Sequence, residues 1–401
     1  MQKLIFTLII ALLALVAGAA RMWNVRDVFQ EGRIYFTESD AYSRMTRVRM
    51  IAEGQDWTIR HHSFENWPEG TKPHTTAPMD WTILSLRPAV SVALAMIDPG
   101  KTSVLRGEAI DLAGALAGPL LGILTCLAVA FALPKESARE RWFVIATVLV
   151  LAVSSIIVHG TLLGRPDHQS LLIFLLGFAM AAEIRLVRSV TRPWAMAAGA
   201  AWGLALWVSL YEPLILLAAT LLGSSFSTPN LFRDWARRAG WTVTGAIFLL
   251  GVVIDGWRIT LPDAGMREAF GRWKLSIGEM QPLNLSDGTL WNWAGWLIVL
   301  APVSLAWQWR QRPECRVALV LLLTTFALTL WQIRWGYFLV LAFALTLPLQ
   351  LSAAPRPWIG WIGFFVGIWP LLGDWDRRLY PDEGEERRRF VARSEQKALR
   401  E

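Results

Sequence analysis

Long apolar stretches recur along the sequence, and they limit the possible folds more than any other feature. A helix of about 20 apolar residues can cross a bilayer, and such stretches return from Leu4 to the region of Gly373. Only 18% of the residues are charged, against about a quarter in a typical soluble domain. This composition excludes a soluble globular enzyme, and two cysteines are too few for a disulfide-stapled secreted domain. The sequence therefore predicts an all-α polytopic membrane protein.

The apolar stretches predict about eleven membrane spans. The first, near residues 4–20, has the proportions of a signal peptide, but we expect an uncleaved span because the following membrane-embedded chain needs an anchor in this orientation. The stretch 83–97 is apolar but short and contains Arg87-Pro88, so it predicts an interfacial or re-entrant helix instead of a span. The other spans are expected near residues 109–133, 142–158, 170–186, 195–209, 211–226, 241–257, 289–308, 316–331, 337–353 and 357–373.

Basic residues are concentrated in the short connections between these stretches. With the N-terminus in the cytoplasm, every short inner loop is basic, as the positive-inside rule requires. These loops are residues 134–141, 185–193, 228–240 and 310–316 and the one that contains Arg356. The outer segments are then residues 21–108, 159–169, 255–289, 332–336 and those after Asp374. The net charge of +7 is explained without a nucleic-acid partner. We expect a multi-pass protein of the inner (cytoplasmic) membrane.

The chain divides into two regions by composition. Residues 1–375 contain all the expected spans and form one predicted transmembrane domain, whose large outer loops are 21–108 and 255–289. Residues 376–401 are highly charged. This tail predicts either a solvated C-terminus or the start of a soluble outer domain.

Four ionisable residues fall in four separate outer segments: Asp40, Asp167, Glu279 and Arg334. Each also has a purely structural explanation. Asp40 could be a solvated loop acid, and Asp167 could cap a helix that begins near Ser170. Glu279 could lie on a loop surface, and Arg334 could be an interfacial arginine whose charged end reaches water. Together, three carboxylates on one side of a membrane scaffold suit a Mg²⁺ or Mn²⁺ site. An arginine nearby presents a guanidinium fork that suits phosphate oxygens. This combination predicts chemistry on a lipid-linked phosphate or pyrophosphate at the outer membrane face.

The same residues lie in short motifs that occur in a fixed order. Residues 39–42 read Ser-Asp-Ala-Tyr and residues 67–71 read Trp-Pro-Glu-Gly-Thr. Residues 164–169 read Gly-Arg-Pro-Asp-His-Gln, residues 276–282 read Ser-Ile-Gly-Glu-Met-Gln-Pro, and Ile-Arg-Trp at 333–335 precedes a span. Residues 39–42 resemble the first-loop motif of the catalytic subunit of oligosaccharyltransferases, and residues 67–71 resemble the turn downstream of it. Residues 164–169 resemble the second-loop motif and residues 276–282 the flexible-loop motif of that family. Residues 333–335 match the place of its pyrophosphate-contacting arginine. The resemblance extends over about residues 4–375.

This resemblance implies a GT-C-like transmembrane helix bundle and a role for each motif residue. The implied metal ligands for Mg²⁺ or Mn²⁺ are Asp40, Asp167, Gln169 and Glu279; Asp40 and Glu279 are also the implied catalytic residues, and Arg334 the pyrophosphate-binding residue. Gln169 stands where relatives have an acidic residue or histidine, so the metal shell would have a neutral carbonyl ligand or lose that ligand. His168 and, in the first outer loop, His74 are further candidates.

The implied function is transfer of a glycan from a polyprenyl-pyrophosphate donor to a protein or peptide acceptor on the periplasmic or extracellular face. By resemblance, the acceptor is asparagine in Asn-x-Ser/Thr. The family's Trp-Trp-Asp-Tyr-Gly motif does not occur in residues 1–401, and we expect it in a soluble domain after Glu401. Two alternatives stay open: a polyprenyl-phosphate-monosaccharide glycosyltransferase acting on lipid or a protein hydroxyl, and a transporter of the lipid-linked glycan. A transporter would place its charges near mid-membrane in broken helices.

Overall fold

The protein is described by a computed structural model, and its fold is helical apart from one short hairpin in the described residues. The described residues are 2–73, 75–97, 105–228, 231–257, 268, 271–272, 274–380 and 384. The candidate His74, part of the outer loop 255–289 and almost all of the tail 376–401 beyond Tyr380 lie outside them. The predicted all-α class is confirmed within this part of the chain.

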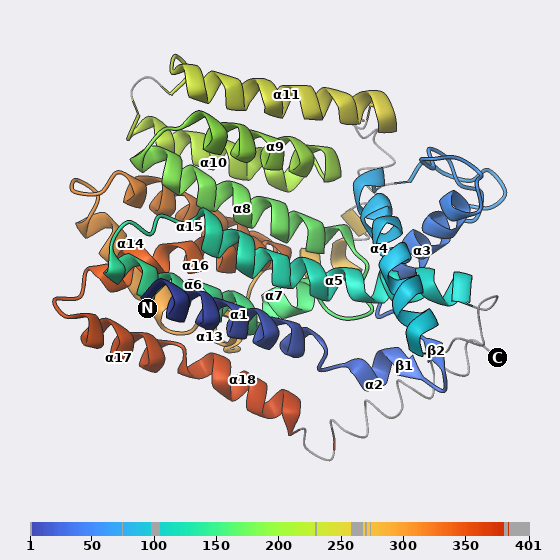
Figure 1. Ribbon diagram of the computed structural model, residues 1–401, viewed down its shortest axis with the longest axis horizontal. Coiled ribbons are helices and arrows are strands. Elements are labelled where there is room, and N and C mark those ends of the chain that lie inside the picture. The colour runs from blue at the N-terminus through green and yellow to red at the C-terminus, as the bar shows by residue number, and fades with distance from the viewer. Residues whose placement is uncertain are drawn as a thin grey trace.

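Long helices lie side by side and form a bundle (Figure 1). Among them, α16 (Gly336–Ser352) is buried along its whole length except for its last residue, because neighbouring helices surround it. The other long members are α1 (Gln2–Arg21), α5 (Leu105–Ala132), α6 (Ala138–Val153), α8 (His168–Arg188), α9 (Arg192–Val208), α10 (Tyr211–Ser225), α11 (Trp235–Asp255) and α15 (Glu314–Trp331).

Six helices in the described residues are long and apolar enough to span a membrane. They correspond to the predicted spans near 4–20, 109–133, 170–186, 241–257, 316–331 and 337–353. Three more apolar helices are shorter: Tyr211–Ser225, Leu297–Trp307 and Pro357–Gly367. The protein is thus a multi-pass helical membrane protein, while the count of eleven spans stays a prediction.

Three of the predicted spans are divided into two helices each. The span 289–308 contains α13 (Thr289–Ala294) and α14 (Leu297–Trp307), separated at Gly295, whose φ of +72° favours glycine. The span 142–158 contains α6 and α7 (Ser155–Gly160), and the span 357–373 contains α17 (Pro357–Gly367) and α18 (Trp369–Leu379). Apolar composition continues through these breaks, so it could not reveal them.

Glycines bring α9 and α11 into close contact. A Cβ at Gly199 would lie 2.2 Å from the carbonyl oxygen of Gly240, and one at Gly240 would lie 2.5 Å from that of Ala195. Only glycine permits this approach of the two backbones. The pair carries Trp207 and Asp255 at its C-terminal ends, so these two side chains are held on one rigid unit.

Two helices and a short hairpin with the turn before it gather at one end of the bundle. There α3 (Ser39–Ala52) and α4 (Ala77–Ile97) lie across the direction of the long helices, next to α2 (Val25–Val28) and the hairpin of β1 (Phe29–Gln30) with β2 (Arg33–Ile34) (Figure 1). The predicted interfacial piece 83–97 is the second part of α4, which contains Pro88. Buried Asp80 of α4 accepts hydrogen bonds from Arg44 at 2.8 Å and Arg47 at 3.3 Å, and so joins α4 to α3.

Cysteine labelling tests which end of the bundle faces outward. We expect an impermeant maleimide on intact cells to label Leu275→Cys but not Glu136→Cys, because residues 134–141 form a basic, predicted inner loop. Both positions are exposed, Leu275 at 78% and the Glu136 side chain at 67%. The native Cys126 and Cys315 are buried, so the background should be low. Both variants should label after permeabilisation, and the opposite pattern in intact cells would contradict an outward-facing site.

Candidate functional site

The segments that carry the four sequence-predicted residues meet at one end of the bundle. Asp40 lies in the first turn of α3 and Asp167 directly precedes α8. Glu279 lies in the 3₁₀ turn η1 (Gly278–Met280) and Arg334 in the 3₁₀ turn η2 (Ile333–Trp335). The backbone N–H of Ile333 donates to the carbonyl oxygen of Gln281 at 2.8 Å, which joins the η1 and η2 segments directly.

Arg165 connects the acidic segments, although the sequence analysis did not select it. Its guanidinium donates to Glu38 at 2.8 Å and to Glu279 at 3.3 Å. It also donates to the Tyr337 hydroxyl at 3.1 Å, the His159 ring at 3.0 Å and the His159 carbonyl oxygen at 3.1 Å. The side chain is 3% exposed. A guanidinium has five N–H donors in a rigid fork, which allows one buried residue to hold these four segments together.

A glycine turn brings Glu38 to Arg165. Gly164 has a φ of +74°, and a Cβ there would lie 2.7 Å from a methyl group of Val28. Its backbone donates to Ala115 and accepts from Thr37, each at 3.0 Å, which fixes the chain before α3 against the chain before α8. Glu38 lies within two residues of the predicted Asp40, and Arg165 lies inside the motif 164–169. Sequence position alone did not indicate that these two would form the ion pair.

Asp167 is both a helix cap and a buried charge. Its carboxylate accepts from the backbone N–H of His168 and from the Nδ1 of the same residue, both at 2.6 Å, and the residue is 6% exposed. Burial alone would favour the neutral acid, but His168, Arg165 and Arg44 together outweigh it and hold the pKa of Asp167 well below its ordinary value. The carboxylate therefore stays ionised. Its hydrogen bond to the first backbone N–H of α8 confirms the expected role as a helix cap.

The environment of Arg165 also shifts the pKa values of Glu38 and His159. Burial raises the pKa of Glu38, the carboxylates of Asp167 and Glu279 add to this rise, and Arg165 opposes it. Burial, helped by the Arg165 cation, lowers the pKa of His159 to about 3. The His159 ring is therefore neutral, and its Nδ1 accepts from Arg165, which can only donate.

Gln169 presents a buried acceptor without a partner. The residue is 3% exposed, and its side-chain carbonyl oxygen has no hydrogen-bond partner among the residues that the structure describes. Leaving such an acceptor unsatisfied costs about 1–3 kcal/mol. A bound cation or a hydroxyl group would satisfy it.

The predicted three-carboxylate metal site is not assembled in this conformation. Within the described ranges, no three His, Cys, Asp or Glu side chains lie close enough together to hold a metal ion. Asp40 is exposed at the start of α3, and the carboxylate of Glu279 is held by Arg165. Asp167 and Gln169 both carry side-chain oxygen atoms, the ligand type that Mg²⁺ and Mn²⁺ prefer.

Arg334 is paired with a carboxylate that sequence reasoning missed. Its guanidinium donates to Glu212, a buried residue in the first turn of α10. The Lys274 ammonium group lies 5.9 Å from the ring centre of Trp331 at the end of α15, close to the same segment. The predicted phosphate-binding arginine is thus neutralised by its own chain in this conformation.

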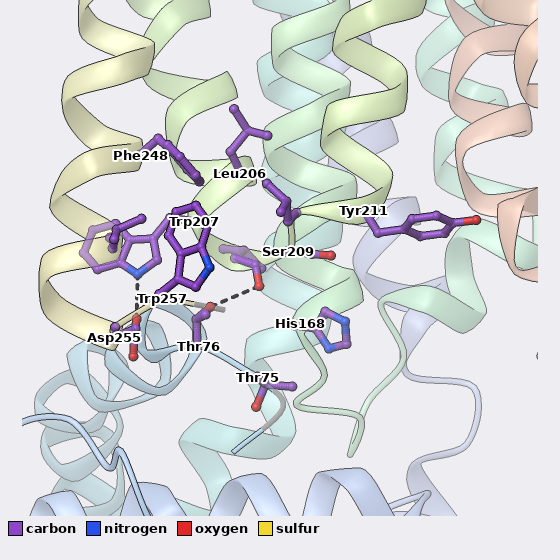
Figure 2. Close-up of a pocket in the computed structure, with 15 residues that line it drawn as sticks. Thr75, Thr76, His168, Leu206, Trp207, Ser209, Tyr211, Phe248, Asp255 and Trp257 are labelled. Atoms are coloured by element: carbon purple, nitrogen blue, oxygen red, sulfur yellow. Dashed lines mark hydrogen bonds between the residues drawn. The ribbon is translucent and has the colours of Figure 1, made fainter. Parts of the chain in front are cut away.

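A cavity of about 260 Å³ lies next to the segments that carry Asp167 and Glu212 (Figure 2). Trp207, whose ring nitrogen donates to Asp255 at 2.6 Å, forms one wall. His168, the partner of Asp167, and Tyr211, the residue before Glu212, line it as well. The Tyr211 ring packs edge-on against Trp335, with ring centres 5.5 Å apart. The cavity therefore borders residues adjacent to Asp167 and Glu212, whereas Asp167, Glu212 and Arg334 are not among the residues that line it.

Comparisons with solved structures return archaeal oligosaccharyltransferases from Archaeoglobus fulgidus. The structure of AglB with an inhibitory peptide and a dolichol-phosphate has a TM-score of 0.64 at 15% identity, covering 95% of this chain and 57% of that chain. The complex with Zn and sulfate has a TM-score of 0.61 at 16% identity, covering 94% and 54%. The structure tethered to an acceptor peptide containing the NVT sequon has a TM-score of 0.59 at 15% identity, covering 98% and 55%.

No protein-family model matches the sequence, and the search of curated proteins gave no match. The chain spans little more than half the length of the solved structures that it matches. At this identity the likeness concerns the fold. Over nearly its whole length, this chain has the membrane fold of the archaeal oligosaccharyltransferases.

Proposed function

We propose that this protein transfers a glycan from a polyprenyl-pyrophosphate donor to an asparagine side chain of a protein or peptide at the outer membrane face. The observation that carries the proposal is the meeting of segments 164–169, 276–282 and 332–336 at one end of a fold shared with oligosaccharyltransferases. One of those structures contains a dolichol-phosphate and another an acceptor peptide with a sequon. Both ligand classes fit a donor side near Arg334 and an acceptor side near Asp40.

On the acceptor side, the exposed carboxylates are suited to hold a weak nucleophile. The Asp40 residue is exposed, and the Glu279 side chain is 41% exposed although Arg165 holds one of its oxygens. Carboxylates that accept from the amide N–H groups would orient the amide nitrogen toward the anomeric carbon. The C–N bond then forms as the anomeric C–O bond breaks, the pyrophosphate leaves with the electron pair, and the amide proton passes to a carboxylate or water.

On the donor side, the cavity and Arg334 are suited to the first sugar and the pyrophosphate. The cavity offers Trp207 as an apolar wall and Asp255, Thr76 and Ser209 as polar groups. Its volume of about 260 Å³ lies just below the usual range of small-molecule pockets, roughly 300–1,000 Å³, which fits one sugar ring better than a whole glycan.

Asp167 and Gln169, joined by Asp40 and Glu279 once Glu279 leaves Arg165, would hold the Mg²⁺ or Mn²⁺ ion. The unpartnered carbonyl oxygen of Gln169 supports this ligand set. When bound, the ion would neutralise charge on the departing pyrophosphate. Arg165 would hold Glu279 until the acceptor arrives. His168 would keep the Asp167 carboxylate ionised and oriented.

The transporter alternative is less well supported. It requires charged groups near mid-membrane, whereas the charged groups of this site lie before or after the long helices. Asp167 precedes α8, and Arg334 precedes α16. An enzyme working at the membrane surface accounts for this arrangement.

The proposal is tested with purified protein, a polyprenyl-pyrophosphate-linked N-acetylhexosamine and a fluorescent peptide containing Asn-x-Thr. We expect transfer to this peptide, no transfer to the same peptide with Gln for Asn, loss of transfer in EDTA, and recovery with Mg²⁺ or Mn²⁺. Full activity in EDTA would contradict the metal site. Transfer from a polyprenyl-phosphate monosaccharide instead would favour the monosaccharide-transferase alternative.

A further inference from the structure

The ion pair between Glu212 and Arg334 is built with more contacts than a surface pair. The Glu212 side chain is 2% exposed and that of Arg334 is 18% exposed. One carboxylate oxygen of Glu212 accepts from Arg334 and the other accepts from the hydroxyl of Ser209 at 2.6 Å. The charge of Glu212 also lies in the first turn of α10, where the helix dipole favours an anion. The carboxylate is therefore fixed in place rather than free to leave Arg334.

The residue next to Glu212 connects the pair to the cavity lining. Tyr211 lines the cavity and packs on Trp335, which follows Arg334. An anion that reaches Arg334 meets a guanidinium already bound to a carboxylate. The guanidinium can still donate through its remaining N–H groups, but the anion experiences an ion pair instead of an unopposed cation.

We propose that Glu212 weakens the hold of Arg334 on pyrophosphate, so that the spent lipid carrier can leave after transfer. This inference rests on the proposed function, in which Arg334 binds the donor pyrophosphate. Transfer breaks the sugar–phosphate bond and leaves a terminal phosphate with one more ionisable oxygen than the donor had. The product is thus more negative than the donor, and a fixed carboxylate repels it more strongly. Glu212 is a positioning residue that acts through Arg334 and lowers the affinity for product more than that for donor.

The repulsion between Glu212 and the product predicts how the kinetics change when Glu212 loses its charge. Without the charge of Glu212, Arg334 would bind both lipids more tightly, the product most of all. Glu212→Gln should therefore lower the KM for donor, lower kcat through slow product release, and strengthen inhibition by polyprenyl pyrophosphate. A purely structural ion pair would lower activity and stability without tightening the binding of either lipid.

The experiment measures the binding of polyprenyl pyrophosphate to the full chain in detergent. We expect Glu212→Gln to bind it roughly tenfold tighter than the wild type, the size of one charge interaction between partly buried groups, and to gain less affinity for the glycosylated donor. Glu183→Gln is the matched control, because Glu183, at 3% exposure, is as buried as Glu212 and pairs with Arg237 near the other ends of the helices. This control should leave both affinities unchanged.

Arg334→Gln separates the two proposals. If it weakens binding of polyprenyl pyrophosphate while folded Glu212→Gln binds no tighter than the wild type, the inference on Glu212 is wrong and the donor site stands. If Arg334→Gln binds the lipid as the wild type does, the donor assignment fails and the inference fails with it. Glu212→Ser provides a second neutral variant with the same expected direction, should Glu212→Gln not fold.

Discussion

Replacing Asp167 with asparagine is expected to lower glycan transfer by at least ~10²-fold, the scale of losing a catalytic electrostatic group. Asparagine caps a helix about as well as aspartate, so α8 should still begin at His168. The change removes a buried negative charge and one charged oxygen ligand of the proposed metal site. The measurement is the initial transfer rate at saturating donor and peptide, together with the thermal unfolding temperature in detergent.

Asp234→Asn is the matched control for this prediction. Asp234 caps α11 as Asp167 caps α8: its side chain accepts from the backbone N–H of Arg237 at 2.9 Å. Asp234 lies in the predicted inner loop 228–240, on the opposite side of the predicted membrane topology from the proposed site. Unchanged transfer in Asp234→Asn with a large loss in Asp167→Asn would place the effect in the site. Wild-type transfer by Asp167→Asn, with or without EDTA, would refute the metal role of this carboxylate.

Glu279→Gln is expected to lower turnover by about 10²-fold, as for a group that acts on a proton or on developing charge. The Glu279 carboxylate is held from one side by Arg165 at 3.3 Å and is open on the other. The Glu279 side chain is 41% exposed, so an acceptor can approach the carboxylate from its open side. The measurement is the rate of peptide glycosylation, with donor binding measured in parallel.

Donor binding should survive in Glu279→Gln, since the pyrophosphate contact proposed for Arg334 does not involve this carboxylate. The matched control is Glu268→Gln in the same loop, where the side chain is 68% exposed and pairs with Arg272. An exposed pair of this kind contributes little, so Glu268→Gln should transfer at the wild-type rate. Equal rates for the two variants would reduce the resemblance of residues 276–282 to coincidence. Failure of Glu279→Gln to fold would make the contact with Arg165 structural.

The sequence predicted the features that depend on local composition. A helix that crosses lipid must satisfy its own backbone hydrogen bonds and present apolar side chains, so the runs that became α1, α5, α8, α11, α15 and α16 were evident without any tertiary information. The motifs around Asp167, Glu279 and Arg334 were found by their resemblance to those of oligosaccharyltransferases. The structure brings their segments to one end of the bundle.

The partners of these residues were decided only by the tertiary structure. Arg165 pairs with Glu38, which is 127 residues away in the chain, and Arg334 pairs with Glu212, 122 residues away. The turn at Gly164 brings the first pair together, and the packing of Tyr211 on Trp335 accompanies the second. A hydrogen bond depends on a few tenths of an ångström, whereas apolar composition determines only that a segment is buried in lipid or protein. The sequence could therefore predict where the ionisable residues would gather, and only the packing of the helices could decide which charges neutralise one another.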